Sequence, residues 1–418
     1  MPKVMDEPKV TWFNILLLLV MIFNAGGVRI VDNYVLTLAT LFLLAIQIIV
    51  KETFHLRYAL IASVTVILFL AAHYFLTSRG LPIKHYIIYF SYLLTAIAIV
   101  AAYKGGNGIF QLDIYAALKF ILAHALLGAV LQLIMEPSFD LNLDRAHILY
   151  VFYYDQAKDI SFMFRNAGFF WEPGVLQIFL NILLYMSLFI YRQKVIAALC
   201  CMAIISTIST AGYLVMAMLV FFWVVQQLRS FTLAAPTYLI VMLLIIALSG
   251  FSLMNKLYGE RHKSADVRQF DMVVGFSVIK DHPILGIGMS SERLLDIYHE
   301  IGKEHQKDFS ITEHELENKG TTNGILYLAT ALGLPWLLLW IFLALRQNIF
   351  PHRWLVLLML LMFCSSEPII QTAFFSLFWA FGLYAVMFRK DSQHDDGISN
   401  ERLCKNENQG DCSLGNSR

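Results

Sequence analysis

Residues 56–76 read LRYALIASVTVILFLAAHYFL, and Arg57 is the one residue in this stretch that is charged at neutral pH. A helix needs about 20 predominantly apolar residues to cross the hydrocarbon core of a bilayer. The stretch therefore predicts a membrane-spanning helix. Similar stretches recur along the chain, and the predicted spans, about twelve in number, are residues 12–28, 32–50, 56–76, 83–103, 113–135, 173–191, 194–209, 211–228, 233–254, 322–345, 352–366 and 368–388.

The composition agrees with an all-α polytopic membrane protein. Of the 418 residues, 58% are hydrophobic and 15% are charged, whereas soluble proteins contain about 25% charged residues. These values exclude a soluble globular enzyme, a disordered chain and a collagen-like chain. The formal net charge of +1 gives no reason to expect a nucleic-acid partner. The five cysteines lie in apolar segments or in the polar tail, which predicts neither a disulfide framework nor a metal site.

The distribution of Lys and Arg predicts the orientation in the membrane. With the N-terminus in the cytoplasm, the short cytoplasmic loops and termini carry twelve of these residues, and the short outer loops carry three. Because Lys and Arg accumulate on the cytoplasmic side of membrane proteins, both termini are predicted to be cytoplasmic. Residues 194–228 leave two interpretations open: two tight crossings joined at Ser206–Gly212, or one long tilted helix.

Two long loops interrupt the predicted helical domain, residues 1–390, and a polar tail follows it. The loops, at about 136–172 and 255–321, are predicted to face outward on the same side of the membrane. The second carries five of the twelve histidines, and its Ser290–Glu304 stretch has a helix-forming composition. Loops of this length are usually functional or contain secondary structure of their own. Residues 391–418 are polar and are predicted to be a disordered cytoplasmic tail.

The first candidate motif is Phe164–Gly174, FRNAGFFWEPG, at the entry to the sixth predicted span. A Glu before Pro at a helix start can simply cap the free backbone amides. That interpretation accounts for Glu172, but it does not require Arg165 earlier in the motif. A second Glu-Pro pair, at Glu367, opens the twelfth predicted span on the same outer face.

Two further candidate motifs follow in the second long loop and at its end. The first combines Arg261 and Arg268 with the stretch Lys280–Gly288, KDHPILGIG, which includes His282; the alternative is a solvated loop with a Pro-Gly turn. The second opens the tenth predicted span with Asn323, which is equally compatible with a helix cap.

Taken together and in this order, these segments resemble the O-antigen polymerase and O-antigen ligase family of bacterial membrane glycosyltransferases. The resemblance covers roughly residues 165–340. It rests on the Arg-x-x-Gly-Phe-x-x-Glu-Pro-Gly stretch that ends at Gly174, and on Arg268 followed by the stretch that ends at Gly288. Two positions depart from the family pattern. Thr322 stands where members often carry a His, and Thr210–Gly212 reads TAG where members often carry Ser-Arg-Gly.

The resemblance implies transfer of a polyprenyl-pyrophosphate-linked oligosaccharide to a sugar hydroxyl, at the outer face of the bacterial inner membrane and without a cofactor. The acceptor would be another glycan, as in polymerisation of O-antigen or exopolysaccharide repeat units, or the lipid A-core, as in an O-antigen ligase. Membrane lipid and a chain-length regulator are the other implied partners. A polysaccharide or lipid transporter is the alternative from a different class. The implied catalytic residues are Arg268, Arg165, Glu172 and His314, and the implied substrate-binding residues are Arg261, His282, Asn323 and Glu367.

Overall fold

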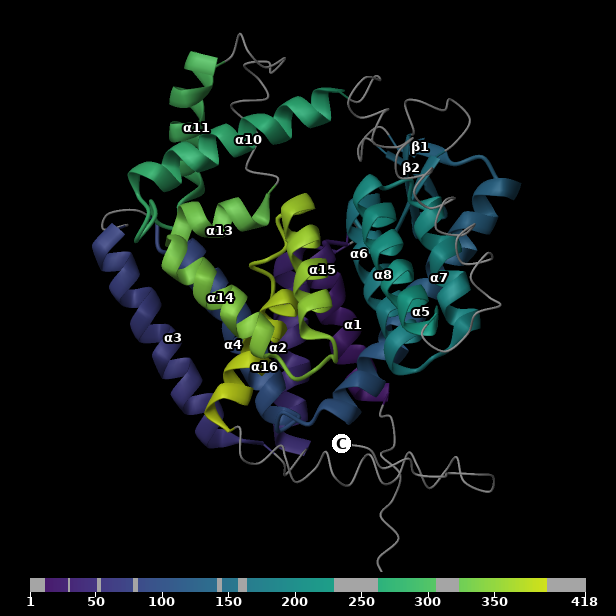
Figure 1. Ribbon diagram of the computed structural model, residues 1–418, viewed down its shortest axis with the longest axis horizontal. Coiled ribbons are helices and arrows are strands. Elements are labelled where there is room, and N and C mark those ends of the chain that lie inside the picture. The colour runs from purple at the N-terminus through teal and green to yellow at the C-terminus, as the bar shows by residue number, and fades with distance from the viewer. Residues whose placement is uncertain are drawn as a thin grey trace, which may run out of the picture.

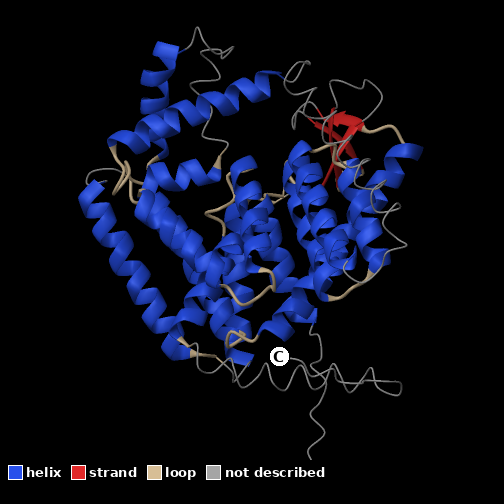
Figure 2. Ribbon diagram, viewed as in Figure 1, coloured by secondary structure: helices blue, strands red, loops and turns tan. Residues whose placement is uncertain are grey.

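The structure is a computed structural model, and it describes residues 12–28, 31–50, 54–77, 82–140, 145–156, 164–228, 262–305 and 323–388. It is a bundle of helices with one small sheet at the end of the bundle that also carries α10 and α11 (Figures 1 and 2). The elements are α1 Trp12–Gly26, α2 Asn33–Val50, α3 Leu56–Thr77, α4 Lys84–Ala102, α5 Asn107–Ile134, β1 Ser138–Asp140, β2 Arg145–Ile148, β3 Phe152–Gln156, β4 Phe164–Gly168, α6 Pro173–Tyr185, η1 Met186–Ile190, α7 Lys194–Ser206, α8 Thr210–Leu228, α10 His262–Asp281, α11 Ser291–His305, α13 Gly324–Leu332, α14 Leu334–Arg346, α15 Arg353–Ser366 and α16 Ala373–Met387.

The helices have the length and composition of a multi-pass membrane protein. Within the described ranges, five helices are long and apolar enough to cross a bilayer. They are Leu56–Thr77, Lys84–Ala102, Gly108–Ile134, Pro173–Ile190 and Thr210–Gln227. Six shorter apolar helices of 10–17 residues accompany them. The predicted span 233–254 and the predicted tail 391–418 lie outside the described residues.

Two predominantly apolar, largely buried helices form the centre of the bundle. All thirteen residues of α6 are buried, and α6 packs against α5, α7 and α8. Helix α16 packs against α4 and α14. A helix without a polar face is stable only when neighbours surround it. Phe179 of α6 meets Phe374 of α16 edge to face at 5.3 Å, so the two central helices are in direct contact.

The region 194–228 forms two helices and not one. Helices α7 and α8 pack against each other and are separated by a short turn. Ile208 in this turn has a positive φ of 47°, which a continuous helix does not contain. The prediction of two helices joined within Ser206–Gly212 is therefore the correct one of the two alternatives.

The predicted span 322–345 is wrong as one continuous helix. It breaks into α13 and α14 at Gly333, whose φ is +85°. The N–H of Leu334 leaves the helix ladder and donates to the carbonyl of Pro283 at 2.9 Å, and Pro335 has no N–H to give. The 282–288 loop covers this break, and its backbone supplies the partners of the interrupted helix ladder.

The first long loop contains a four-stranded antiparallel sheet of order β1-β2-β3-β4, which the all-α prediction did not include. The sequence of β3, FYYDQ, is rich in the aromatic residues that favour strands. Tyr154 donates to the carbonyl of Gly128 at 2.7 Å, and Asn166 donates to that of Ala125 at 2.8 Å. These bonds hold the sheet against α5. Strand β4 ends at Gly168, four residues before Glu172, so the sheet also positions the segment that carries Glu172.

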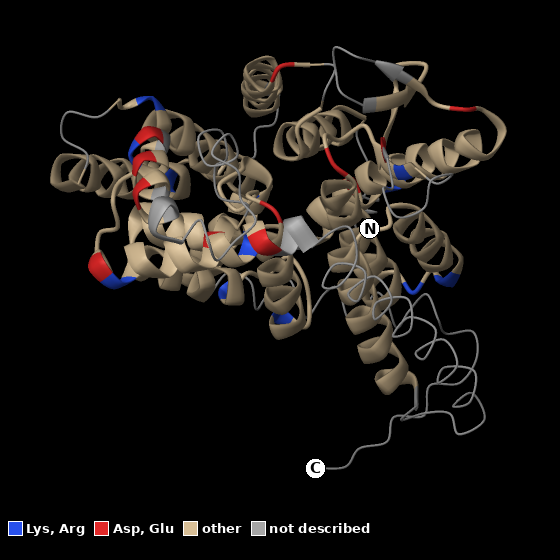
Figure 3. Ribbon diagram, turned by 90° about the horizontal axis from the view of Figure 1, so that it is seen from above, with Lys and Arg blue, Asp and Glu red and all other residues tan. Residues whose placement is uncertain are grey.

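The second long loop contributes the helices α10 and α11. Helix α11 covers the predicted helix-forming stretch Ser290–Glu304 almost residue for residue, which confirms that it is helical. Acidic and basic residues gather on these two helices and at helix ends, whereas the apolar helices of the bundle are nearly free of them (Figure 3). The sheet and both helices lie at the same end of the bundle (Figure 1).

Candidate functional site

Four segments that are distant in the sequence meet at the bend between α15 and α16, residues 366–368, which we call the Glu367 corner. Glu367 is 6% exposed. A Cβ atom added to Gly174 would overlap Glu367 Oε1, so the carboxylate lies against the backbone of the first turn of α6. Gly174 is therefore the residue that permits this close approach.

The electrostatics at the start of α6 favour a negative charge. The first backbone N–H groups of a helix have no partner within the helix, and the helix dipole places positive potential there. Glu172 occupies the N-cap position, with φ −144° and ψ 149°, but its side chain makes no capping hydrogen bond. The capping interpretation of Glu172 is therefore wrong. The carboxylate that lies beside this helix start comes from Glu367.

Arg268, from the second long loop, also lies at the Glu367 corner. It lies on α10, is partly buried, and its Nη2 donates to the backbone carbonyl of Ser366 at 3.4 Å. Ser366 immediately precedes Glu367. The fold thus places the cation of α10 at the corner that holds one of the predicted carboxylates.

The start of α13 forms another wall of the corner. A Cβ atom at Gly324 would lie 3.1 Å from the carbonyl oxygens of both Cys364 and Glu367. Asn323 Oδ1 accepts from the N–H groups of Ile325 and Leu326 at 3.0 and 3.1 Å, so this side chain caps α13. The capping interpretation of Asn323 is therefore confirmed.

The start of α8, where the family pattern often has Arg, lies along the same side of α6. Gly212 packs against Gln177, and Asn181 Nδ2 donates to the carbonyl of Gly212 at 3.3 Å. Gln177 is one helical turn from Gly174. The small side chain of Ala211 supplies no cation at this place, in agreement with the departure seen in the sequence.

The remaining predicted site residues have other surroundings. Arg165 of β4 lies opposite Asp155 of β3, and its Nη1 is 3.6 Å from Asp155 Oδ2. His282 lies exposed in the turn that follows α10. Arg261 and His314 lie outside the described residues. No group of three or more His, Cys, Asp and Glu side chains within the described ranges is arranged to hold a metal ion.

The 282–288 loop is an exposed turn only over residues 282–285, where the N–H of Gly286 donates to the carbonyl of His282 at 3.1 Å; residues 286–288 are buried. Ile287 and Gly288 donate their N–H groups to the carbonyls of Thr330 and Ala331, at 2.8 and 3.0 Å, at the end of α13. Gly286 has φ +63°, and a Cβ atom there would overlap the Thr330 carbonyl oxygen. The loop therefore closes the break between α13 and α14 and fixes α10 relative to the corner.

We expect Gly286→Ala to destabilise the protein by about 1–3 kcal/mol, because alanine must adopt a left-handed conformation and displace backbone. The measurement is the temperature at which the detergent-solubilised protein loses its monodisperse chromatographic peak. Gly108→Ala is the control, since nothing lies within 4 Å of a Cβ atom at Gly108. Equal melting temperatures for the two variants would contradict this role of Gly286.

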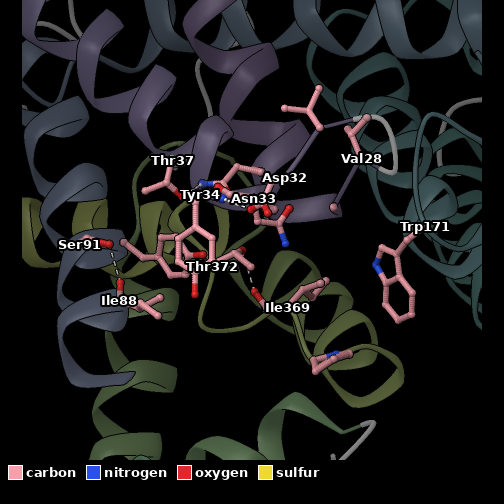
Figure 4. A pocket seen from close by; sticks show the side chains of 16 residues that line it. Val28, Asp32, Asn33, Tyr34, Thr37, Ile88, Ser91, Trp171, Ile369 and Thr372 are labelled. Carbon is pink, nitrogen blue, oxygen red and sulfur yellow. Dashed lines mark hydrogen bonds between the residues drawn. The ribbon is translucent and has the colours of Figure 1, made fainter. Parts of the chain in front are cut away.

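A cavity of about 850 Å³ adjoins the corner. Its walls come from the end of α1, the start of α2, the first half of α4, Trp171 and the residues after Glu367 (Figure 4). Trp171 precedes Glu172, and Pro368 follows Glu367, so each of the two carboxylates neighbours a wall residue in the chain. The sequence carried no motif for this cavity, because its walls come from segments that are distant in the chain.

Comparison with known protein families finds a match, which covers part of the chain. Residues 194–341, about a third of the chain, match the family described as O-antigen ligase. No curated protein and no solved structure matches the chain. The matched segment includes Arg268, the 282–288 loop and the α13–α14 break, whereas Glu172 and Glu367 lie outside it. The resemblance to the O-antigen polymerase and ligase family that was seen in the sequence is thus confirmed over residues 194–341.

Proposed function

We propose that the protein transfers an oligosaccharide from a polyprenyl pyrophosphate to a sugar hydroxyl at the outer face of the bacterial inner membrane, and that it polymerises O-antigen or exopolysaccharide repeat units. The acceptor oxygen forms the new glycosidic bond as the bond between the donor sugar and the pyrophosphate breaks. The polyprenyl pyrophosphate leaves, and the acceptor hydroxyl gives up a proton. The family match supports glycan transfer of this kind.

The observation that carries the proposal is the meeting of Arg268 with the Glu367 corner. A pyrophosphate leaving group gains negative charge as it departs, and a guanidinium binds phosphate oxygens in pairs and stays charged. A guanidinium that donates to Ser366 is positioned to hold the leaving group beside the buried carboxylate of Glu367, the residue that follows Ser366.

The proposed roles follow from this arrangement. Arg268 and Arg165 bind the pyrophosphate, and Glu172 accepts the proton of the acceptor hydroxyl, with His314 as the second candidate for the base. Glu367 binds substrate together with Arg261, His282 and Asn323.

The test is a gel of surface polysaccharide from a strain that lacks the gene, with and without the wild-type gene restored. A ladder that collapses to single repeat units, and returns with the gene, identifies the polymerase. Loss of surface-attached ladder while lipid-linked polymer accumulates identifies a ligase that attaches glycan to the lipid A-core. An unchanged ladder for every surface glycan contradicts glycan transfer and leaves the transporter alternative.

We predict that Arg165→Ala abolishes activity while the protein still inserts into the membrane, because Arg165 is proposed to contact the donor. Asp155→Asn is the matched control, since it also breaks the Arg165–Asp155 ion pair but keeps the guanidinium. The ladder gel and the amount of protein in the membrane are measured for both variants. Equal losses of activity in the two variants would mean that Arg165 serves only to hold the sheet.

A further inference from the structure

We propose that the cavity beside the Glu367 corner binds a sugar residue of the acceptor glycan and so determines which acceptor is used. This inference rests on the proposed glycan transfer. It assigns the acceptor to the side of the corner formed by Trp171 and Pro368, whereas Arg268 reaches the corner at Ser366. It also assigns acceptor selection to segments outside the family match.

The lining of the cavity fits sugar hydroxyl groups better than a phosphate. It contains one carboxylate, from Asp32, together with amide and hydroxyl side chains such as Asn33 and Thr372. No Lys or Arg is present among the described residues that line it. A diphosphate requires cationic donors, whereas a sugar hydroxyl can donate to a carboxylate oxygen and can both donate to and accept from a side-chain amide.

Aromatic side chains complete the lining. Tyr34 and Trp171 both border the cavity, and Figure 4 shows Trp171 on the far side of the cavity from Thr372. Flat aromatic rings with a polar group combine a large apolar face with one hydrogen bond, which suits ligands that have both apolar and polar faces. A sugar ring is such a ligand, since its C–H faces are apolar and its edge carries hydroxyls.

Asp32 is held in place with its second oxygen still available. Its Oδ1 accepts from the backbone N–H of Tyr34 at 2.8 Å. Within the described part of the chain, that is the one hydrogen bond made by this carboxylate. The bond caps the start of α2, and it also fixes the carboxylate at the edge of the cavity, so that Oδ2 can accept from a sugar hydroxyl.

The cavity wall is tied to the proposed base. The N–H of Trp171 donates to the carbonyl of Gly27 at 3.1 Å, and Val28 pairs with Phe170 in an isolated antiparallel bridge. The indole of Trp171 lies 3.2 Å from the position of a Cβ atom at Gly27. Gly27 and Val28, at the end of α1, are therefore fixed to the residues that directly precede Glu172, and a sugar held in the cavity lies beside the chain segment that carries Glu172.

The test measures protection of a cysteine placed in the cavity. Asn33→Cys is labelled on spheroplasts with a membrane-impermeant maleimide, and the wild-type chain reports any labelling of the native cysteines. One probe is the lipid-free oligosaccharide released by mild acid from the lipid-linked glycan of the same strain. The other is polyprenyl phosphate. Ser138→Cys, on the exposed side of β1 at the same end of the bundle, is the matched control.

We expect the oligosaccharide to slow labelling of Asn33→Cys about fivefold or more and to leave the labelling rate of Ser138→Cys unchanged. Polyprenyl phosphate should protect neither cysteine. Labelling of Asn33→Cys at one rate with and without oligosaccharide would overturn the inference, as would protection by polyprenyl phosphate alone. Protection should persist when Arg268→Ala is added. If the oligosaccharide does not protect Asn33→Cys while the wild-type strain makes a ladder that Arg268→Ala abolishes, the acceptor site is refuted and the proposed transfer stands. If Arg268→Ala leaves the ladder unchanged, the proposed catalytic site is refuted.

Discussion

Arg268→Ala is expected to reduce transfer by about 100-fold or more, because loss of one preorganised donor to a developing negative charge typically costs that much. The guanidinium of Arg268 donates to the Ser366 carbonyl and thereby lies at the Glu367 corner. Alanine removes both the charge and the paired N–H groups. The measurement is the initial rate of transfer in membranes that are supplied with extracted lipid-linked repeat units, and the ladder gel is its counterpart in the cell.

Two variants show whether the loss is specific. Lys280→Ala removes a cation from an exposed position near the end of the same helix, and we expect wild-type rates for it. Arg268→Lys keeps the charge but not the planar fork, so it should retain only part of the activity. Wild-type activity in Arg268→Ala, at normal protein levels, would exclude Arg268 from the site.

Glu172→Gln is expected to lower kcat by about 100-fold or more with little change in KM, because general bases contribute about 10²–10⁴-fold to a reaction rate. Glutamine keeps the shape of the side chain but cannot accept the proton. Since Glu172 does not cap α6 with its side chain, the substitution leaves the helix start intact. The measurement is kcat, together with the KM for the acceptor, at a saturating concentration of donor.

Two other glutamates that directly precede a proline, Glu136 and Glu367, provide the comparisons. Glu136→Gln changes an exposed carboxylate beyond the end of α5, and we expect no effect on transfer. Glu367→Gln is expected to raise KM more than it lowers kcat, because Glu367 is proposed to bind substrate. If Glu367→Gln lost kcat and Glu172→Gln did not, the base would be Glu367 and the assignment made here would be wrong.

Much of the site depends on contacts that no local pattern contains. The paired motifs at Glu172 and Glu367 were visible in the sequence, and so was Arg268. Their meeting was not, since Gly174, Arg268 and Glu367 come from three segments far apart in the chain. The same holds for the 282–288 loop, whose glycines reflect close packing against the end of α13.

The sequence by itself determined the class of protein, the presence of most helices and the family resemblance of residues 194–341, because hydropathy, helix caps and motif spacing are local properties. Asn323 and the helix at Ser290–Glu304 were predictable for this reason. Only the tertiary structure decided that 194–228 forms two helices, that 322–345 breaks at Gly333, and that a sheet links α5 to Glu172. Each of these features is stabilised by partners from distant segments, such as the carbonyl of Pro283 for Leu334 and that of Ala125 for Asn166, and such partners are absent from any short stretch of sequence.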